Sequence, residues 1–132
     1  MSIEYSASAW HPSRSRRFMI AGDESDLAVI QLMLSALPDR SHGMVFVEYD
    51  AERTEPAPIH CPPRVSIHWL PMQPGPDGHG RALARAIDLW REEFLTAPDF
   101  DDPSEFRVWI GCAACPVVAA LNREIEAQIQ PL

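Results

Sequence analysis

Two stretches of the chain are apolar without interruption, and two others alternate between apolar and polar side chains. The uninterrupted stretches, RRFMIAG at 16–22 and GMVFVEY at 43–49, are typical of strands buried on both faces of a sheet. The alternating stretches, VSIHWL at 65–70 and FRVWIG at 106–111, are typical of strands with fewer neighbours to cover them. The pattern therefore predicts two central strands and two edge strands.

Three further stretches show the spacing of amphipathic helices. Apolar side chains recur on one helical face in 24–37, in 81–95 and in 116–129. Asp23 is a suitable N-cap for the first of these helices, and Asp26 stands where a capping box has its second partner. Strands that alternate with helices predict a three-layer α/β domain, with a mostly parallel four-stranded sheet and helices on both faces.

The order of the strands follows from their expected burial and from the handedness of the crossovers. With the uninterrupted strands at the centre and right-handed connections, we predict the order 3-2-1-4. The chain then reverses direction between strands 1 and 4, and ligands of such sheets bind beyond the carboxyl ends of the strands at that point. The residues that end these two strands, and are predicted to line a crevice there, are Gly22, Asp23, Glu24, Gly111 and Cys112.

The second strand ends in the acidic stretch VEYDAER. An acid about 20 or more residues after the first glycine turn is placed to bind a ribose hydroxyl. Glu48 and Asp50 both meet this condition, and Arg53 is placed to meet a 2′-phosphate instead. Solvated loop charges are the simpler interpretation, and it stays open. The GPDGHG loop at 75–80 either rims the same crevice or is a flexible connector.

The stretch CAAC places Cys112 and Cys115 at the start of the last predicted helix. A helix N-terminus lowers the pKa of a thiol, so the two are a candidate redox pair. Two other interpretations stay open: a thiol packed at a tight strand-to-helix turn, and a ligand-facing role for Cys112 alone. The chain has 3 cysteines, an odd number that favours reduced thiols over a disulfide framework.

The residue types of a zinc site occur at His60, Cys61, Cys112 and Cys115. However, Cys61 precedes strand 3 at the amino end of the sheet, whereas Cys112 follows strand 4 at the carboxyl end. A strand length of about 17–20 Å separates those ends, so no metal site is predicted. Other histidines have no partner at ligand spacing and are expected on the surface: His11, His42 and His79.

Charge and composition exclude several classes of function. The net charge of −8 disfavours nucleic acid and anionic membranes as partners. All 11 basic residues counted as Lys or Arg are arginines, so a Schiff-base or P-loop lysine is excluded. No apolar run reaches the length of a signal peptide or the roughly 18 residues of a membrane span, so we expect a cytoplasmic protein without membrane insertion.

Four blocks of the chain, taken in order, resemble the second domain of the siderophore-interacting protein family. They are RRFMIAGDESDLAVIQLMLSALP, MVFVEYDAER, VSIHWLPMQPGPDGHGRALARAI and FRVWIGCAACPVVAALNREI. Members of this family are similar to ferredoxin reductases: an N-terminal β-barrel binds FAD, and the C-terminal domain binds NAD(P)H or receives electrons by another route. The resemblance implies that residues 17–132 form such a C-terminal domain, with a fold like the NADP domain of ferredoxin reductases, after an irregular arm at 1–16.

The resemblance also implies a role in ferric-siderophore reduction and iron release in the cytoplasm. About sixteen residues precede the first strand, which leaves no room for the flavin barrel. Without flavin, a hydride cannot be split into the single electrons that Fe(III) accepts. We therefore expect FAD only through a partner domain in trans, and no complete active site in this chain. After the last strand, Ile110-Gly111-Cys112 stands where the family usually has Ala-Gly-Glu.

Three hypotheses follow. The first is a nucleotide-binding module of the siderophore-interacting type, which takes NAD(P)H and acts on a ferric siderophore only indirectly. The second is a non-catalytic interaction module derived from that domain, for instance a homodimer. The third is a dithiol redox protein. In the first, the nicotinamide side is expected at Asp23, Glu24, Gly111 and Cys112, and the ribose side at Glu48, Asp50 and Arg53.

Overall fold

The computed structural model describes residues 17–95, 106–112 and 114–129. The arm predicted for 1–16 lies outside the described residues. The elements are β1 (Arg17–Asp23), a 3₁₀ helix η1 (Glu24–Asp26), α2 (Leu27–Ser35), β2 (His42–Tyr49), β3 (Arg64–Pro71), α3 (Arg81–Phe94), β4 (Phe106–Ile110) and α4 (Pro116–Ile129).

The four strands form one parallel sheet in the order β3-β2-β1-β4, which confirms the predicted topology. The uninterrupted apolar strands β1 and β2 lie at the centre, and the alternating strands β3 and β4 lie at the edges. The register pairs Asp23 with Glu48 between β1 and β2, and Ala21 with Ile110 between β1 and β4. The carboxyl ends of β1, β2 and β4 therefore meet at one edge of the sheet.

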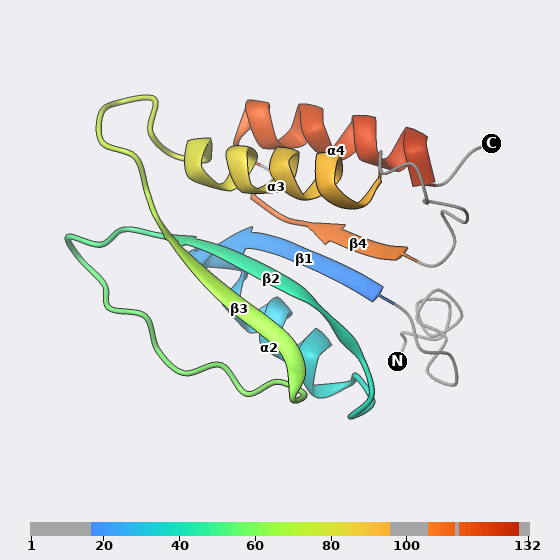
Figure 1. Cartoon of the computed structure of the whole chain (residues 1–132). Helices are drawn as coiled ribbons and strands as arrows, with labels where there is room; N and C mark the ends of the chain where they lie inside the picture. Colours follow the sequence, from blue (N-terminus) through green and yellow to red (C-terminus); the bar gives the residue numbers. More distant parts are fainter. Residues whose placement is uncertain (1–16, 96–105, 113, 130–132) are drawn as a thin grey trace.

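Helices cover both faces of the sheet, as the sequence predicts. Figure 1 shows α3 and α4 side by side on one face and α2 on the other. Alternate residues of β1 point to opposite sides: Phe18 and Ile20 pack with the core under α2, whereas Met19 and Ala21 pack with the core under α3 and α4. Full burial of β1 on both faces explains why its sequence has no polar alternation.

The turn between β1 and α2 contains the predicted capping box. The Asp23 carboxylate accepts from the backbone that follows it, and the Asp26 side chain accepts from the backbone N–H of Asp23. The helix ends at Ser35, before the predicted limit of 37. Ala36 is the C-cap residue, and Pro38 disfavours the helical conformation at Leu37.

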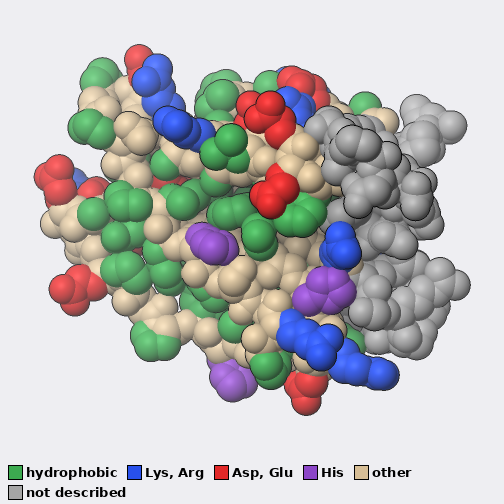
Figure 2. Space-filling model, in the orientation of Figure 1, with side chains coloured by type: hydrophobic (Ala, Val, Ile, Leu, Met, Phe, Trp, Pro, Cys, Tyr) green, Lys and Arg blue, Asp and Glu red, His purple; other side chains and the backbone are tan. Residues whose placement is uncertain are grey.

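Charged side chains are spread over the surface of the described residues. On the face shown in Figure 2, acidic and basic side chains of the described residues lie in several separate groups. Among the helices of the described ranges, none is both long enough and apolar enough to cross a bilayer.

Candidate functional site

Four side chains with chemically useful groups meet at the carboxyl ends of β1 and β4. Asp23 ends β1, His79 precedes α3, and Cys112 and Cys115 flank the turn from β4 into α4. One oxygen, nitrogen or sulfur atom from each side chain lies within 4.8 Å of the corresponding atoms of the other three. Asp23, Cys112 and Cys115 were predicted to lie here, whereas His79 was not.

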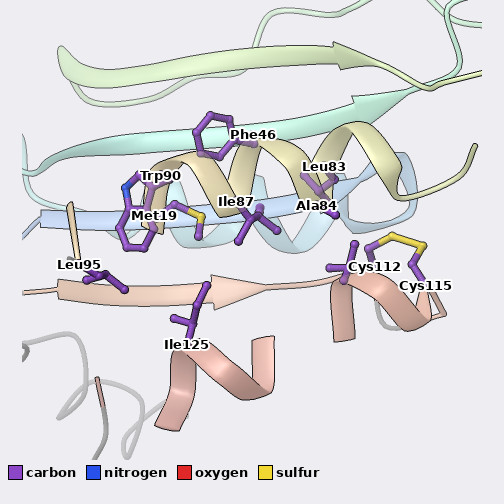
Figure 3. Packing of buried hydrophobic residues seen from close by; sticks show 12 residues of the cluster. Met19, Phe46, Leu83, Ala84, Ile87, Trp90, Leu95, Cys112, Cys115 and Ile125 are labelled. Atoms are coloured by element: carbon purple, nitrogen blue, oxygen red, sulfur yellow. A yellow bond between two sulfur atoms is a disulfide. The ribbon is translucent and has the colours of Figure 1, made fainter. Parts of the chain in front are cut away.

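Cys112 and Cys115 form a disulfide, with their Cα atoms 5.7 Å apart (Figure 3). The expectation of three reduced thiols is therefore wrong for this pair, and Cys61 is the free cysteine. The parity of the cysteine count cannot reveal a local bridge. The turn between β4 and α4 brings the two Cα atoms to a separation that is ordinary for a disulfide.

Cys112 has a left-handed backbone, with φ at 54°. This conformation costs a residue other than glycine about 1–2 kcal/mol, so the surroundings must hold it in place. Two hydrogen bonds do so. The N–H of Cys112 donates to Asp26 Oδ2 at 2.9 Å, and the carbonyl of Cys112 accepts from the N–H of Cys115 at 2.9 Å.

Asp26 joins the ends of β1 and β4. Its Oδ2 accepts from the N–H of Asp23 at 3.0 Å as well as from the N–H of Cys112. A Cβ added at Gly22 or Gly111 would lie 2.8 or 2.5 Å from this oxygen. These two glycines, which were predicted to line a crevice, thus make room for the Asp26 carboxylate. The predicted capping box was the signal for Asp26, but it did not indicate the bond to Cys112.

Asp23 is held from two sides. Its Oδ1 accepts from the N–H and the hydroxyl of Ser25, and its Oδ2 lies 2.8 Å from His79 Nε2. Burial alone would raise the pKa of Asp23, but the hydrogen bonds from Ser25 and His79 outweigh it and lower the pKa below its usual value. Asp23 is therefore a carboxylate at neutral pH, with one oxygen directed at the histidine.

His79 lies beside the disulfide, and the expectation that it has no partner is wrong. Its Nδ1 is 3.5 Å from Cys115 Sγ, and its Nε2 is 3.8 Å from Cys112 Sγ. Its side chain is 49% exposed, so the ring also faces solvent. The sequence signal was the GPDGHG loop at 75–80, for which a place at the rim of this crevice was one of two open interpretations.

Glu48 has a different role from the predicted ribose contact. It is 1% exposed, and its two oxygens accept from the N–H groups of Gly80 at 2.7 Å and Leu83 at 3.1 Å. It therefore caps α3, whose N-cap residue Gly80 has a left-handed φ of 90° and no side chain to do so. Burial leaves Glu48 no surface to offer a ligand.

The other residues predicted for the ribose side lie in the turn after β2. The N–H of Asp50 donates to Glu24 Oε1 at 3.0 Å, and Asp50 Oδ2 lies 3.7 Å from Arg53 Nε. The Arg53 side chain is 86% exposed. The structure therefore brings Glu24, Asp50 and Arg53 together at the same edge of the sheet, and leaves Arg53 accessible.

Cys61 lies far from the disulfide in the fold. Its thiol donates to the carbonyl of Val65 at the start of β3, and it packs with the core under α2. Cys112 and Cys115 belong to the core on the opposite face. This placement agrees with the argument against a zinc site that combines His60 and Cys61 with the other two cysteines.

A cavity of about 440 Å³ opens beside the disulfide. It lies between the loop before α3 and the start of α4, and His79, Arg81, Cys115 and Val117 contribute to its lining. Arg81 is the basic side chain in this lining, and Asp77 is an acidic one. The cavity thus combines an apolar wall with one basic and one acidic side chain at the carboxyl edge of the sheet.

The family model and the similar solved structures point to the same family of proteins. The model of the siderophore-interacting protein family matches residues 15–129. A siderophore utilization protein from T. fusca has the same fold with a TM-score of 0.60 and 20% identity, over 84% of this chain and 40% of that chain. The siderophore-interacting protein SipS from Aeromonas hydrophila matches with a TM-score of 0.52 and 14% identity, over 74% of this chain and 38% of that one. The chain thus spans less than half the length of either protein. A search of curated proteins found no match.

Proposed function

Because the chain belongs to the siderophore-interacting protein family, we propose that it is the nucleotide-binding module of a ferric-siderophore reductase. When bound, NAD(P)H would supply a hydride, and a flavin held by another domain or protein would pass single electrons to Fe(III). The residues of this chain would bind the nucleotide, orient its nicotinamide and exclude water. The ferric siderophore would be the substrate of the whole assembly.

One observation carries this proposal: the carboxyl edge of the sheet, where the chain leaves β1 for α2 on one face and leaves β4 for α4 on the other (Figure 1). Parallel α/β sheets bind their ligands at such a point. A cavity of about 440 Å³ lies beside this edge, and Asp77, Arg81 and Cys115 contribute to its lining. Cavities of this size lie within the usual range for small-molecule sites.

The predicted contacts divide between two parts of this edge. The nicotinamide side would involve Asp23, Glu24 and the backbone of Gly111 and Cys112. The ribose side would involve Asp50 and the exposed guanidinium of Arg53. Since acidic side chains predominate among these residues, the phosphates would depend on arginine. Arg81 is the candidate within the cavity lining.

An NMR titration with NADH and NADPH tests this proposal. We expect saturable shifts of the amides of Gly22, Asp23, Gly111 and Cys112. Arg81→Ala should weaken binding at least about tenfold, since a hydrogen bond to a charged group contributes about 1.5–3 kcal/mol. Arg85→Ala is the matched control, because Arg85 is also exposed and lies one turn later in α3. No shifts at millimolar nucleotide would contradict the proposal and favour the interaction module.

A second candidate, dithiol redox exchange, is favoured by the disulfide itself. A small dithiol would give two electrons and two protons to the bond between Cys112 and Cys115, and would itself become a disulfide. We expect the untreated protein to react at one thiol, Cys61, and the dithiol-treated protein at three. Mass spectrometry after alkylation measures this number. Three reactive thiols before treatment, or one after it, would exclude a reversible pair.

A further inference from the structure

Neither proposed role accounts for the convergence of Asp23 and His79 on the two cysteines. The four side chains offer a carboxylate oxygen, an imidazole nitrogen and two sulfurs, which together are the ligand types of a zinc site. We propose that, when the disulfide is reduced, Asp23, His79, Cys112 and Cys115 bind one Zn²⁺ ion. This site differs from the predicted combination with His60 and Cys61, and it does not depend on nucleotide binding.

The distances from His79 Nε2 to the two sulfurs suit a tetrahedral ion, and the hydrogen bond between His79 and Asp23 would lengthen on metal binding. His79 Nε2 lies 3.8 Å from Cys112 Sγ, 3.7 Å from Cys115 Sγ and 2.8 Å from Asp23 Oδ2. With Zn–S bonds of about 2.3 Å and Zn–N bonds of about 2.0 Å, a tetrahedral site separates its nitrogen and sulfur ligands by about 3.5 Å. The nitrogen is thus already near its required distance from both sulfurs. Breaking the S–S bond lets the two thiolates move apart to complete the site.

The surrounding contacts hold two of the ligands, Asp23 and Cys112, in position. Ser25 occupies Asp23 Oδ1 and leaves Oδ2 directed at His79. Asp26 fixes the backbone of Cys112 and adds negative charge near the cluster. Such supporting hydrogen bonds orient metal ligands and strengthen binding. The half-exposed ring of His79 provides a route by which an ion can enter from solvent.

The proposal makes metal binding and the disulfide mutually exclusive. Reduction by a small dithiol transfers two electrons and two protons to the bond between Cys112 and Cys115, and the small dithiol becomes a disulfide. Zn²⁺ then displaces the two thiol protons and binds the thiolates. Exchange with a small disulfide, which takes the two electrons and becomes a dithiol, re-forms the bond between Cys112 and Cys115 and releases the ion. The site would therefore hold zinc only under reducing conditions.

Cobalt titration of the full chain tests the site, because Co²⁺ takes zinc positions and is coloured. The protein is reduced with a small dithiol, desalted under nitrogen and titrated with Co²⁺. We expect visible bands of tetrahedral cobalt and a near-ultraviolet sulfur-to-cobalt band, both saturating at one equivalent and both removed by Zn²⁺. The oxidised protein should show neither band. Absence of both bands in the reduced protein would overturn the proposal.

Variants assign the ligands. His79→Ala should weaken cobalt binding more than about tenfold, because even supporting residues of zinc sites contribute 10- to 100-fold. The side chain lies half-exposed in a loop, so this variant should fold. Cys115→Ser should at least halve the sulfur-to-cobalt band, because only the Cys112 thiolate remains as a sulfur ligand. Cys61→Ser and His68→Ala are the controls and should bind as the wild type does. A sulfur-to-cobalt band of undiminished intensity in Cys115→Ser, or loss of the bands in Cys61→Ser, would overturn the assignment.

Discussion

Glu48→Ala is expected to lower the free energy of unfolding by about 3 kcal/mol, because two backbone donors at the start of α3 lose a charged acceptor, each worth about 1.5–3 kcal/mol. Those donors are the N–H groups of Gly80 and Leu83. Glu48 is 1% exposed, so water cannot readily replace it. Urea unfolding followed by circular dichroism measures the loss.

Two further variants identify the cause of that loss. Glu48→Gln keeps one acceptor oxygen but places an amide NH₂ against the second backbone donor, so we expect about half the loss of Glu48→Ala. Glu52→Ala removes an exposed acid from the following turn and should change stability by less than about 0.5 kcal/mol. If Glu48→Ala unfolds like the wild type but loses nucleotide binding, the capping role is wrong and the predicted ribose contact regains support.

The fold could be predicted because the sequence patterns that indicate its strands and helices each involve residues close together along the chain. β1 and β2 are apolar throughout, since both of their faces are covered, and β3 and β4 alternate because they lie at the edges. Such patterns depend on neighbours along the chain and on one rule of handedness. The capping box at Asp23 is equally local and was equally predictable.

The site could be predicted only in part, because its contacts join distant segments. The topology brings Asp23 and Cys112 to one edge of the sheet, and this much follows from the strand order. His79 meets Asp23 across 56 residues and Cys115 across 36, and a histidine between two glycines belongs to no periodic pattern. Glu48 was assigned from its place after β2, but its side chain points inward to α3, which strand position alone cannot reveal.

Two acids near the candidate site, Glu48 and Asp26, share one structural role. The carboxyl edge of this sheet contains buried or half-buried acids whose partners are backbone N–H groups: Glu48 caps α3, and Asp26 ties β1 to β4. Acids used in this way hold loops in place and need no ligand. The side chains that remain directed at one another, His79 and the two cysteines, are therefore the better candidates for chemistry.

Asp26→Ala should have the second largest effect on stability, a loss of about 2–3 kcal/mol, because one oxygen accepts from the backbones of both β1 and the turn after β4. Without it, the left-handed turn at Cys112 loses one of its two restraints. We expect faster hydrogen exchange at the amides of Asp23 and Cys112, measured by NMR, together with a lower midpoint in urea.

Asp26→Asn separates the role of shape from that of charge at this position. Both backbone donors bond to the same oxygen, Oδ2, so the carbonyl of an asparagine can accept from both. The loss should therefore fall to about 1 kcal/mol, the difference between a charged and a neutral acceptor. Asp39→Ala, which alters an exposed acid after α2, is the control and should change little. If Asp26→Asn is as unstable as Asp26→Ala, then charge rather than the shared oxygen joins the two strand ends, and the packing role assigned to Gly22 and Gly111 loses its basis.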